Sequence, residues 1–221
     1  MLADSISLPS PTRSAYAVQH RAAFALMIAS GFAGLGYQIV WTQQCALWLG
    51  HEAPAVLAVV TAFFAGLGVG ALALGPLIER SARPARWYAA CELSIAVWGV
   101  SLALLLAPMT REMLELIGMQ PSGLRQATVS FVGTFLLLLP ATAAMGATLP
   151  AMVHVVNSSN SNARSIAALY ACNTLGAVSG VIAVAFWLIP DVGLIRTAIV
   201  CAACNAVCAV VALRLPIDAP A

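Results

Sequence analysis

The sequence predicts an all-α membrane protein, a polytopic bundle of six transmembrane helices. Hydrophobic residues make up 62% of the 221-residue chain and charged residues only 8%, whereas an ordinary soluble domain has about 25% charged residues. The mean hydropathy is +0.94. Nearly all charges lie between six apolar stretches, each long enough to cross the roughly 30 Å hydrocarbon layer as a helix. These stretches are 22–49, 56–78, 87–107, 126–156, 165–188 and 194–213.

The charge composition excludes two classes of protein. A freely soluble globule is excluded by the apolar content, so membrane lipids are the expected surroundings. All ten basic residues are arginines, and the net charge is only +2. Because these arginines are scattered between the apolar stretches, they form no basic patch of the kind that binds nucleic acid.

The arginines also predict the topology. Residues 1–21 are polar and read as a disordered cytoplasmic tail, 22–214 as the six-helix transmembrane domain, and 215–221 as a second cytoplasmic tail. Cytoplasmic loops of membrane proteins carry an excess of basic residues. With both termini inside, seven arginines are cytoplasmic and three are outside. The cytoplasmic set is Arg13, Arg21, Arg80, Arg83, Arg86, Arg164 and Arg214, and the outer set is Arg111, Arg125 and Arg196.

The first two spans combine polar side chains with small residues. The second half of the first span carries Tyr37, Gln38, Trp41 and Gln43, which need partners or water and are therefore expected to face protein. The second span holds three glycines, Gly66, Gly70 and Gly75. Small residues four apart allow two helices to approach closely, so this span predicts a packing seam.

The third and fourth spans are irregular at their outer ends. Residues 109–118 have an apolar and a charged face, which predicts a short helix on the outer membrane interface. The fourth stretch has about 31 residues, which at 1.5 Å per residue is too long for one crossing. We therefore expect Pro140, Gly146 and Pro150 to break or kink it.

The last two spans offer polar and sulfur-containing side chains. The fifth carries Tyr170, Asn173 and Thr174 before a second small-residue pair, Gly176 and Gly180. The sixth carries Cys201, Cys204 and Cys208 on one stripe. Three thiols on one straight helix rarely converge on a single ion, so packing is the favoured role and no metal site is expected.

Four segments of the chain carry a further signal when taken together. They are GFAGLGYQIVWTQ, FFAGLGVGALALGPLIERSARPARWYAACELSIAVWG, LPATAAMGATLPAMV and LYACNTLGAVSGVIAVAFWLIPDVGL. Together they resemble a known family, the membrane part of the fused MFS/spermidine synthase proteins. The resemblance covers about residues 30–213. It implies a bundle similar to half of a major-facilitator fold, in the bacterial cytoplasmic (inner) membrane.

The resemblance also implies a ligand class. In that family a cytoplasmic Rossmann-like domain related to aminopropyltransferases usually follows the membrane region, so a polyamine or related small amine is the implied ligand. No segment resembling that catalytic domain occurs within these 221 residues. The family pattern in the first span usually has an acid and a base where this chain has Gln38 and Gln43. That departure puts in doubt any ion-coupled role of that acid.

Three groups of residues are candidate sites, each with a structural alternative. Glu92 lies inside the third span, and is either a cation or proton site or, as we favour, an ion-pair partner of a nearby arginine. Glu79, Arg80, Arg83 and Arg86 form either a charge latch between helix ends or topology signals alone. The polar residues of the first and fifth spans line either one cavity or a set of interhelical hydrogen bonds. They are Tyr37, Gln38, Trp41, Gln43, Tyr170, Asn173 and Thr174.

The functional expectation is a transporter-like or small-amine-binding membrane domain that is not catalytic by itself. The chain contains no catalytic motif of the GxSxG, HExxH or Walker type, and no cofactor is expected. Since six spans are half of a twelve-helix transporter, a homodimer or a larger complex is expected. The alternatives are an accessory subunit of a membrane protein complex and a membrane anchor for a separately encoded aminopropyltransferase-like enzyme.

Overall fold

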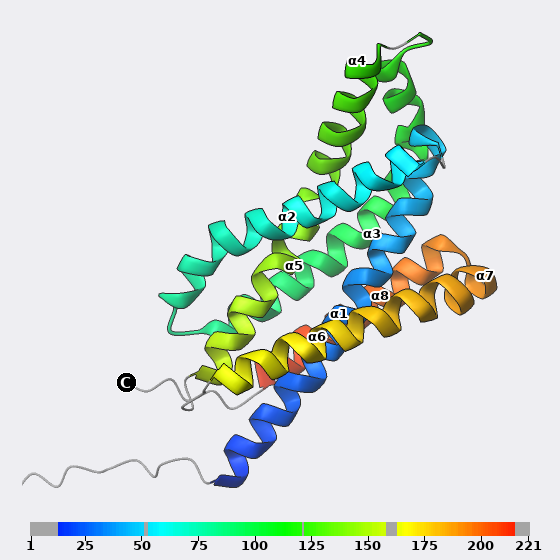
Figure 1. Ribbon diagram of the computed structural model, residues 1–221. Helices are drawn as coiled ribbons and strands as arrows, with labels where there is room; N and C mark the ends of the chain where they lie inside the picture. Colours follow the sequence, from blue (N-terminus) through cyan, green and yellow to red (C-terminus); the bar gives the residue numbers. More distant parts are fainter. Residues whose placement is uncertain (1–12, 51–52, 121, 158–162, 215–221) are drawn as a thin grey trace, which may run out of the picture.

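The protein is a bundle of long helices (Figure 1), and the computed structural model describes residues 13–50, 53–120, 122–157 and 163–214. Six helical runs are long and apolar enough to cross a membrane, and the described residues contain no strand. The predicted all-α fold with six spans is therefore confirmed. The helices are α1 (Arg13–Leu49), α2 (Ala53–Glu79), α3 (Pro84–Ile117), α4 (Gly123–Thr128), α5 (Thr134–Asn157), α6 (Ala163–Ala183), α7 (Ile189–Val192) and α8 (Leu194–Arg214), with π-helical segments η1 (Val129–Gly133) and η2 (Val184–Leu188).

The first helix starts earlier than the sequence predicts. It begins at Arg13, inside the stretch expected to be a disordered tail, and it continues without interruption into the first span. Residues 1–12 and 215–221, the rest of the two expected tails, lie outside the described residues.

The predicted interfacial helix at 109–118 is wrong, because α3 continues through Pro108 to Ile117. Part of the apolar side of this segment contacts protein. Ile117 is buried, and the Sδ atom of Met113 lies 3.8 Å from where a Cβ would stand at Gly133. The end of α3 thus forms one arm of a helical hairpin with α4 and η1.

Of the break or kink predicted for the fourth span, the break is absent. Residues 123–157 are helical throughout, and α5 contains both Pro140 and Pro150. Prolines are tolerated in membrane helices because neighbouring helices and local adjustments compensate for the lost backbone hydrogen bond. The excess length continues past the apolar bundle in the hairpin with α3, where Arg125 Nε donates a hydrogen bond of 3.1 Å to the Leu116 carbonyl.

The three strongest helix pairings of the six spans follow a symmetric pattern between the two halves of the chain, although the α1–α3 contact has no comparable α5–α8 counterpart. The most extensive contacts join α1 with α6, α2 with α5, and α3 with α8; in Figure 1 α2 lies beside α5 and α1 beside α6. Exchanging the first three spans with the last three leaves this pairing unchanged. Three spans per half place the two halves in opposite orientations across the membrane, which is the arrangement of an inverted repeat.

Glycines make the closest helix contacts. Gly66 and Gly70 of α2 face Thr142 and Ala143 of α5 so closely that a Cβ at either position would overlap them. In the other half, Gly176 and Gly180 of α6 face the backbone carbonyls of α1 in the same way.

Of the glycines predicted to pack, Gly75 is different: nothing lies within 4 Å of a Cβ built there. Two further glycines, Gly31 of α1 and Gly146 of α5, were not predicted to be packing residues. They make equally close contacts from the partner helices and complete the two seams. The two glycine seams therefore occupy corresponding places in the two halves.

Candidate membrane-embedded site

Glu92 lies on the buried stripe of α3, in the first third of the helix. Buried residues recur along this helix at spacings of three and four, as expected for the side of a helix that packs against neighbours. They include Tyr88, Glu92, Ile95, Gly99, Leu102 and Leu106. Eight residues separate Glu92 from Pro84 at the start of α3, which is about 12 Å along the helix axis. The side chain is 0% exposed.

The partner of Glu92 comes from the antiparallel helix α8. Asn205 Nδ2 donates a hydrogen bond to Glu92 Oε2 at 2.5 Å. Asn205 lies on the buried stripe of α8 together with Cys201 and Cys208. The hydroxyls of Ser30 on α1 and Tyr88 on α3 lie near the carboxyl group, so three helices enclose it, and the Tyr88 hydroxyl donates its hydrogen bond to the Leu26 carbonyl at 3.3 Å.

Two oxygens of this cluster have no hydrogen-bond partner among the described residues, namely Glu92 Oε1 and Asn205 Oδ1. The favoured prediction, an ion pair with Arg80, Arg83 or Arg86, is wrong. These arginines are exposed, and none is among the groups that interact with the carboxyl. Arg80 and Arg83 precede α3 and Arg86 lies in its first turn, where their long side chains reach water.

A stripe of aromatic and amide side chains continues from the cluster along α1. Tyr37 is an electrostatic neighbour of Glu92 and packs on Gly99 of α3, where a Cβ would lie 2.5 Å from the ring carbon Cζ. Its ring stacks on Trp41 at 5.2 Å and 16°, and Gln44 Nε2 donates to the Ala103 carbonyl of α3 at 2.7 Å. This side of α1 is therefore held against α3.

The structure does not bring the seven polar residues of the first and fifth spans into one cavity. Tyr37 and Trp41 are fully buried, whereas Tyr170 is 61% exposed and Thr174 and Gln43 are exposed as well. Gln38 and Asn173 are half-buried. The Thr174 hydroxyl bonds to the Tyr170 carbonyl of its own helix at 2.9 Å, so it does not connect two spans. Tyr37 and Trp41 face the protein interior, and Tyr170 and Thr174 face outward.

The cysteine stripe of α8 faces α1. The thiol groups of Cys204 and Cys208 point to the carbonyls of Ala29 and Leu26, at 3.5 and 3.9 Å. All six cysteines are free. Among the described residues no group of His, Cys, Asp and Glu side chains is arranged to hold a metal ion.

The four predicted latch residues, Glu79, Arg80, Arg83 and Arg86, lie at the α2–α3 turn. All four are exposed, and the part of the chain that the structure describes shows no ion pair at this turn. The turn is held by other contacts. Arg83 N donates to Ser81 Oγ at 3.2 Å, and His154 Nε2 of α5 lies 3.2 Å from the Ser81 carbonyl. His154 therefore connects this turn to the end of α5.

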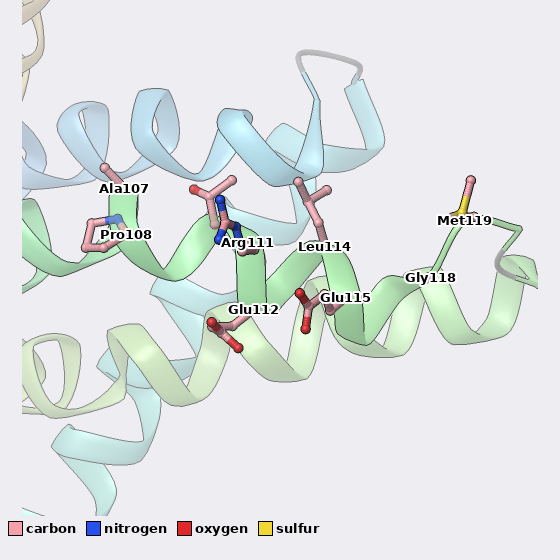
Figure 2. A pocket seen from close by; sticks show the side chains of 9 residues that line it. Ala107, Pro108, Arg111, Glu112, Leu114, Glu115, Gly118 and Met119 are labelled. Atoms are coloured by element: carbon pink, nitrogen blue, oxygen red, sulfur yellow. The ribbon is translucent and has the colours of Figure 1, made fainter.

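A surface pocket of about 970 Å³ lies far from Glu92, around the C-terminal end of α3 (Figure 2). Its polar lining consists mainly of Arg111, Glu112 and Glu115, all exposed to solvent. Nineteen residues, or about 28 Å of helix, separate Arg111 from Glu92. This pocket is open at the surface and shares no residue with the buried cluster.

Sequence reasoning singled out Glu92 but missed Asn205, Tyr88 and Ser30. A signal was available for Asn205, because it is the one asparagine in the stretch 194–213, whose residues from 198 to 213 are otherwise apolar. It also lies on the same helical side as Cys201 and Cys208, four and three residues away. For Ser30 and Tyr88 no signal existed, since serines and tyrosines occur elsewhere in the spans.

The fold and the buried cluster define a multi-pass membrane protein with a polar site enclosed by α1, α3 and α8. Comparison of the chain with protein-family models, with curated proteins and with solved structures gives no match. The class therefore rests on the six membrane-crossing helices themselves.

Proposed function

We propose that this chain is a transporter-like membrane domain that binds a small amine such as a polyamine, and that it is not catalytic by itself. The observation that carries the proposal is Glu92. It is the one acidic side chain buried among the described residues, and its Oε1 oxygen has no partner within them. A carboxylate inside a span is expensive and marks ion or substrate pathways in transporters.

The surroundings of Glu92 suit an ammonium group. An ammonium has three N–H donors and no acceptor, so it needs several oxygens in addition to a negative charge. Asn205 Oδ1 lacks a donor, and the hydroxyls of Ser30 and Tyr88 adjoin the carboxyl. The aromatic face of Tyr37 is a further group that attracts cations.

The symmetric helix pairing supports a transporter-like domain. Transporters built from inverted repeats hold their substrate at the interface of the repeats and expose it to either side in turn. Glu92 and Asn205 lie on α3 and α8, which belong to opposite halves of this chain. Because Glu92 is fully enclosed, amine binding requires a second conformation in which the site opens. A second copy of the chain would supply the six further spans of a complete transporter.

Amine binding is expected to stabilise the purified protein. Titration with spermidine is expected to raise the thermal midpoint in a saturable way, because a ligand that binds only the folded state stabilises it. The Glu92→Gln variant is expected to show no such rise, since a neutral amide cannot compensate an ammonium charge. The measurement is tryptophan fluorescence during heating in detergent.

The matched control is Glu115→Gln, which removes an exposed carboxylate from the outer pocket and is expected to keep the full response. Absence of stabilisation in the unmodified protein would contradict the proposal. An equal response in the Glu92→Gln variant would show that any amine effect arises elsewhere.

A second candidate function is supported by the uneven burial of the spans. The fifth span consists of α6, η2 and α7. In its most apolar part only 17% of the residues are buried, compared with 28% for α2 and 56% for α1. Tyr170 and Thr174 lie on the open side of α6. Polar side chains on an outward face favour contact with another protein, as in an accessory subunit or in an anchor for a separate enzyme. Purification of the native complex with identification of every bound chain would test this role.

We also propose that the chain lies in a bacterial cytoplasmic membrane with both termini inside. The α2–α3 turn and the two chain ends then face the cytoplasm, and α4 faces outward. In intact cells a membrane-impermeant maleimide is expected to label Leu124→Cys but not Ala82→Cys, which is expected to react only after permeabilisation. The unmodified protein shows how much label reacts with the six native cysteines. The reverse labelling pattern would mean that the proposed topology is the wrong way round.

A further inference from the structure

The hydrogen bond between Glu92 and Asn205 leaves one oxygen of each side chain without a donor. Asn205 Nδ2 donates to Glu92 Oε2. The other oxygens, Glu92 Oε1 and Asn205 Oδ1, are both buried and both without a partner in the described chain. An amide oxygen is an acceptor, and so is each oxygen of an ionised carboxylate. If the carboxyl is ionised, both of these unpartnered oxygens are acceptors, and no donor among the described residues makes a hydrogen bond to either one.

A single proton removes this deficit. A protonated carboxyl group has one O–H donor, and a carboxylic acid and a carboxamide can face each other with two hydrogen bonds. In this arrangement the amide N–H donates to one carboxyl oxygen, and the carboxyl O–H donates to the amide oxygen. The first of these bonds is present in the structure, and the two unpartnered oxygens are the atoms that the second would join.

We propose that Glu92 binds a proton when no amine is present, and that the Oε1–H group donates to Asn205 Oδ1. The proton comes from water and converts the carboxylate into the neutral acid, so that no charge remains at the site. The two hydrogen bonds then form a closed ring that joins α3 to α8. This assignment goes beyond the proposed function and does not depend on it, because proton binding needs no amine.

The groups that face Glu92 provide no opposite charge. They are the phenols of Tyr37 and Tyr88, the hydroxyl of Ser30, and the thiols of Cys91, Cys204 and Cys208. None of these is a cation. The neighbouring helix α5 carries one titratable residue, His154, and that side chain contacts the α2–α3 turn instead. An isolated ionised carboxylate in such surroundings loses its hydration without gaining an opposite charge.

The Glu92→Gln variant tests the proposal through stability, because glutamine reproduces the neutral acid. Its amide can donate to Asn205 Oδ1 and accept from Asn205 Nδ2, so both bonds of the ring are kept. The thermal midpoint at neutral pH is expected to stay within a few degrees of that of the unmodified protein. Glu92→Leu and Asn205→Leu are expected to lower it clearly, since each leaves a polar group of the pair buried without its partner.

The pH dependence gives a second readout with a defined sign. Unfolding exposes Glu92 to water, where it releases its proton near neutral pH, so the folded state holds more protons than the unfolded state. Stability therefore falls as the pH rises wherever the folded state holds the extra proton. Relative to Glu92→Gln, the thermal midpoint of the unmodified protein is expected to fall as the pH rises above about 4.3, the ordinary pKa of a glutamate in the unfolded chain. Identical pH profiles would overturn the proposal.

Infrared spectroscopy detects the proton directly. At neutral pH the unmodified protein is expected to show the carbonyl stretching band of a protonated carboxyl group, which is absent in Glu92→Gln and displaced in Asn205→Leu. A spectrum without the band would overturn the proposal. A band that persists in Glu92→Gln would also overturn it, because the proton would then belong to another residue. If the band appears only after sodium is removed, the site holds a metal cation and the proton assignment is wrong.

The outcomes separate this proposal from amine binding. A carboxyl band without stabilisation by spermidine would leave the proton site standing and remove the amine function. Stabilisation by spermidine without a carboxyl band would do the opposite. If both hold, saturating spermidine is expected to abolish the band, because the ammonium group and the proton compete for the same carboxyl oxygen.

Discussion

Replacement of Gly70 with valine is expected to disrupt the folded bundle. A Cβ at this position would overlap the carbonyl oxygen of Ala143 and lie 2.5 Å from its Cα. These are backbone atoms of α5, so no side-chain rotation relieves the overlap and the two helices must move apart. Overpacking typically costs about 1 to 3 kcal/mol and occasionally more. We expect the upper end here, because separation of α2 from α5 opens the whole seam.

The matched control is two residues away on the same helix. Gly68 is exposed, and nothing lies within 4 Å of a Cβ built there, so Gly68→Val is expected to leave the thermal midpoint unchanged or slightly raised. The yield of monodisperse protein and the thermal midpoint in detergent measure both variants. Equal behaviour of the two variants would show that α2 and α5 do not pack as described.

The internal symmetry extends this expectation to the other half. Gly176 of α6 faces the Ile28 carbonyl of α1 as closely as Gly70 faces Ala143. Gly176→Val is therefore expected to behave like Gly70→Val. A large effect at one glycine only would mean that the two seams are not equivalent.

Replacement of Trp41 with alanine is expected to destabilise the protein by about 3 kcal/mol, the lower end of the range for large-to-small aromatic substitutions in cores. Trp41 is fully buried, stacks on Tyr37 and contacts Phe63 of α2 at 6.4 Å between ring centroids. Lipid tails are as apolar as the protein interior, so the loss comes from packing and not from transfer out of water. This argument places the effect at the lower end.

The control for Trp41→Ala is Trp187→Ala in η2. The Trp187 side chain is 59% exposed on the outside of the bundle, so its removal leaves no internal cavity and is expected to change the thermal midpoint little. Thermal unfolding monitored by circular dichroism avoids the change in tryptophan fluorescence. A larger effect at Trp187 than at Trp41 would mean that the outer face of η2 is an interface and that α1 packs differently.

Much of the fold could be predicted from the sequence, because the thickness of the lipid layer sets the length of a span and excludes charges from it. Six apolar stretches in a layer about 30 Å thick permit six helices, and six are present. Features that depend on the partner helix were not predictable in the same way. Residues 109–118 are amphipathic, but amphipathicity does not tell whether the apolar side meets lipid or, as here, η1. Pro140 and Pro150 mark weak points in a helix, yet packing on α2 keeps α5 continuous.

The candidate site was predictable only in part for the same reason. Glu92 is conspicuous because a carboxylate in an apolar span is costly. Its partner depends on the antiparallel pairing of α3 with α8, which a single sequence does not show. The arginines near the start of α3 were closer in sequence than Asn205 and therefore seemed the more plausible partners. Distance along the chain was a poor guide, since Asn205 is 113 residues away.

The hairpin formed by the end of α3 and by α4 with η1 has a practical consequence for structure determination. α3 has 34 residues, or about 51 Å of helix, which exceeds the hydrocarbon layer by about 20 Å. Most of this 22.8 kDa protein is hidden in a micelle and offers electron microscopy few features for particle alignment. A nanobody raised against the tip around Met119 and Leu124, both strongly exposed, would supply an external marker without touching the bundle.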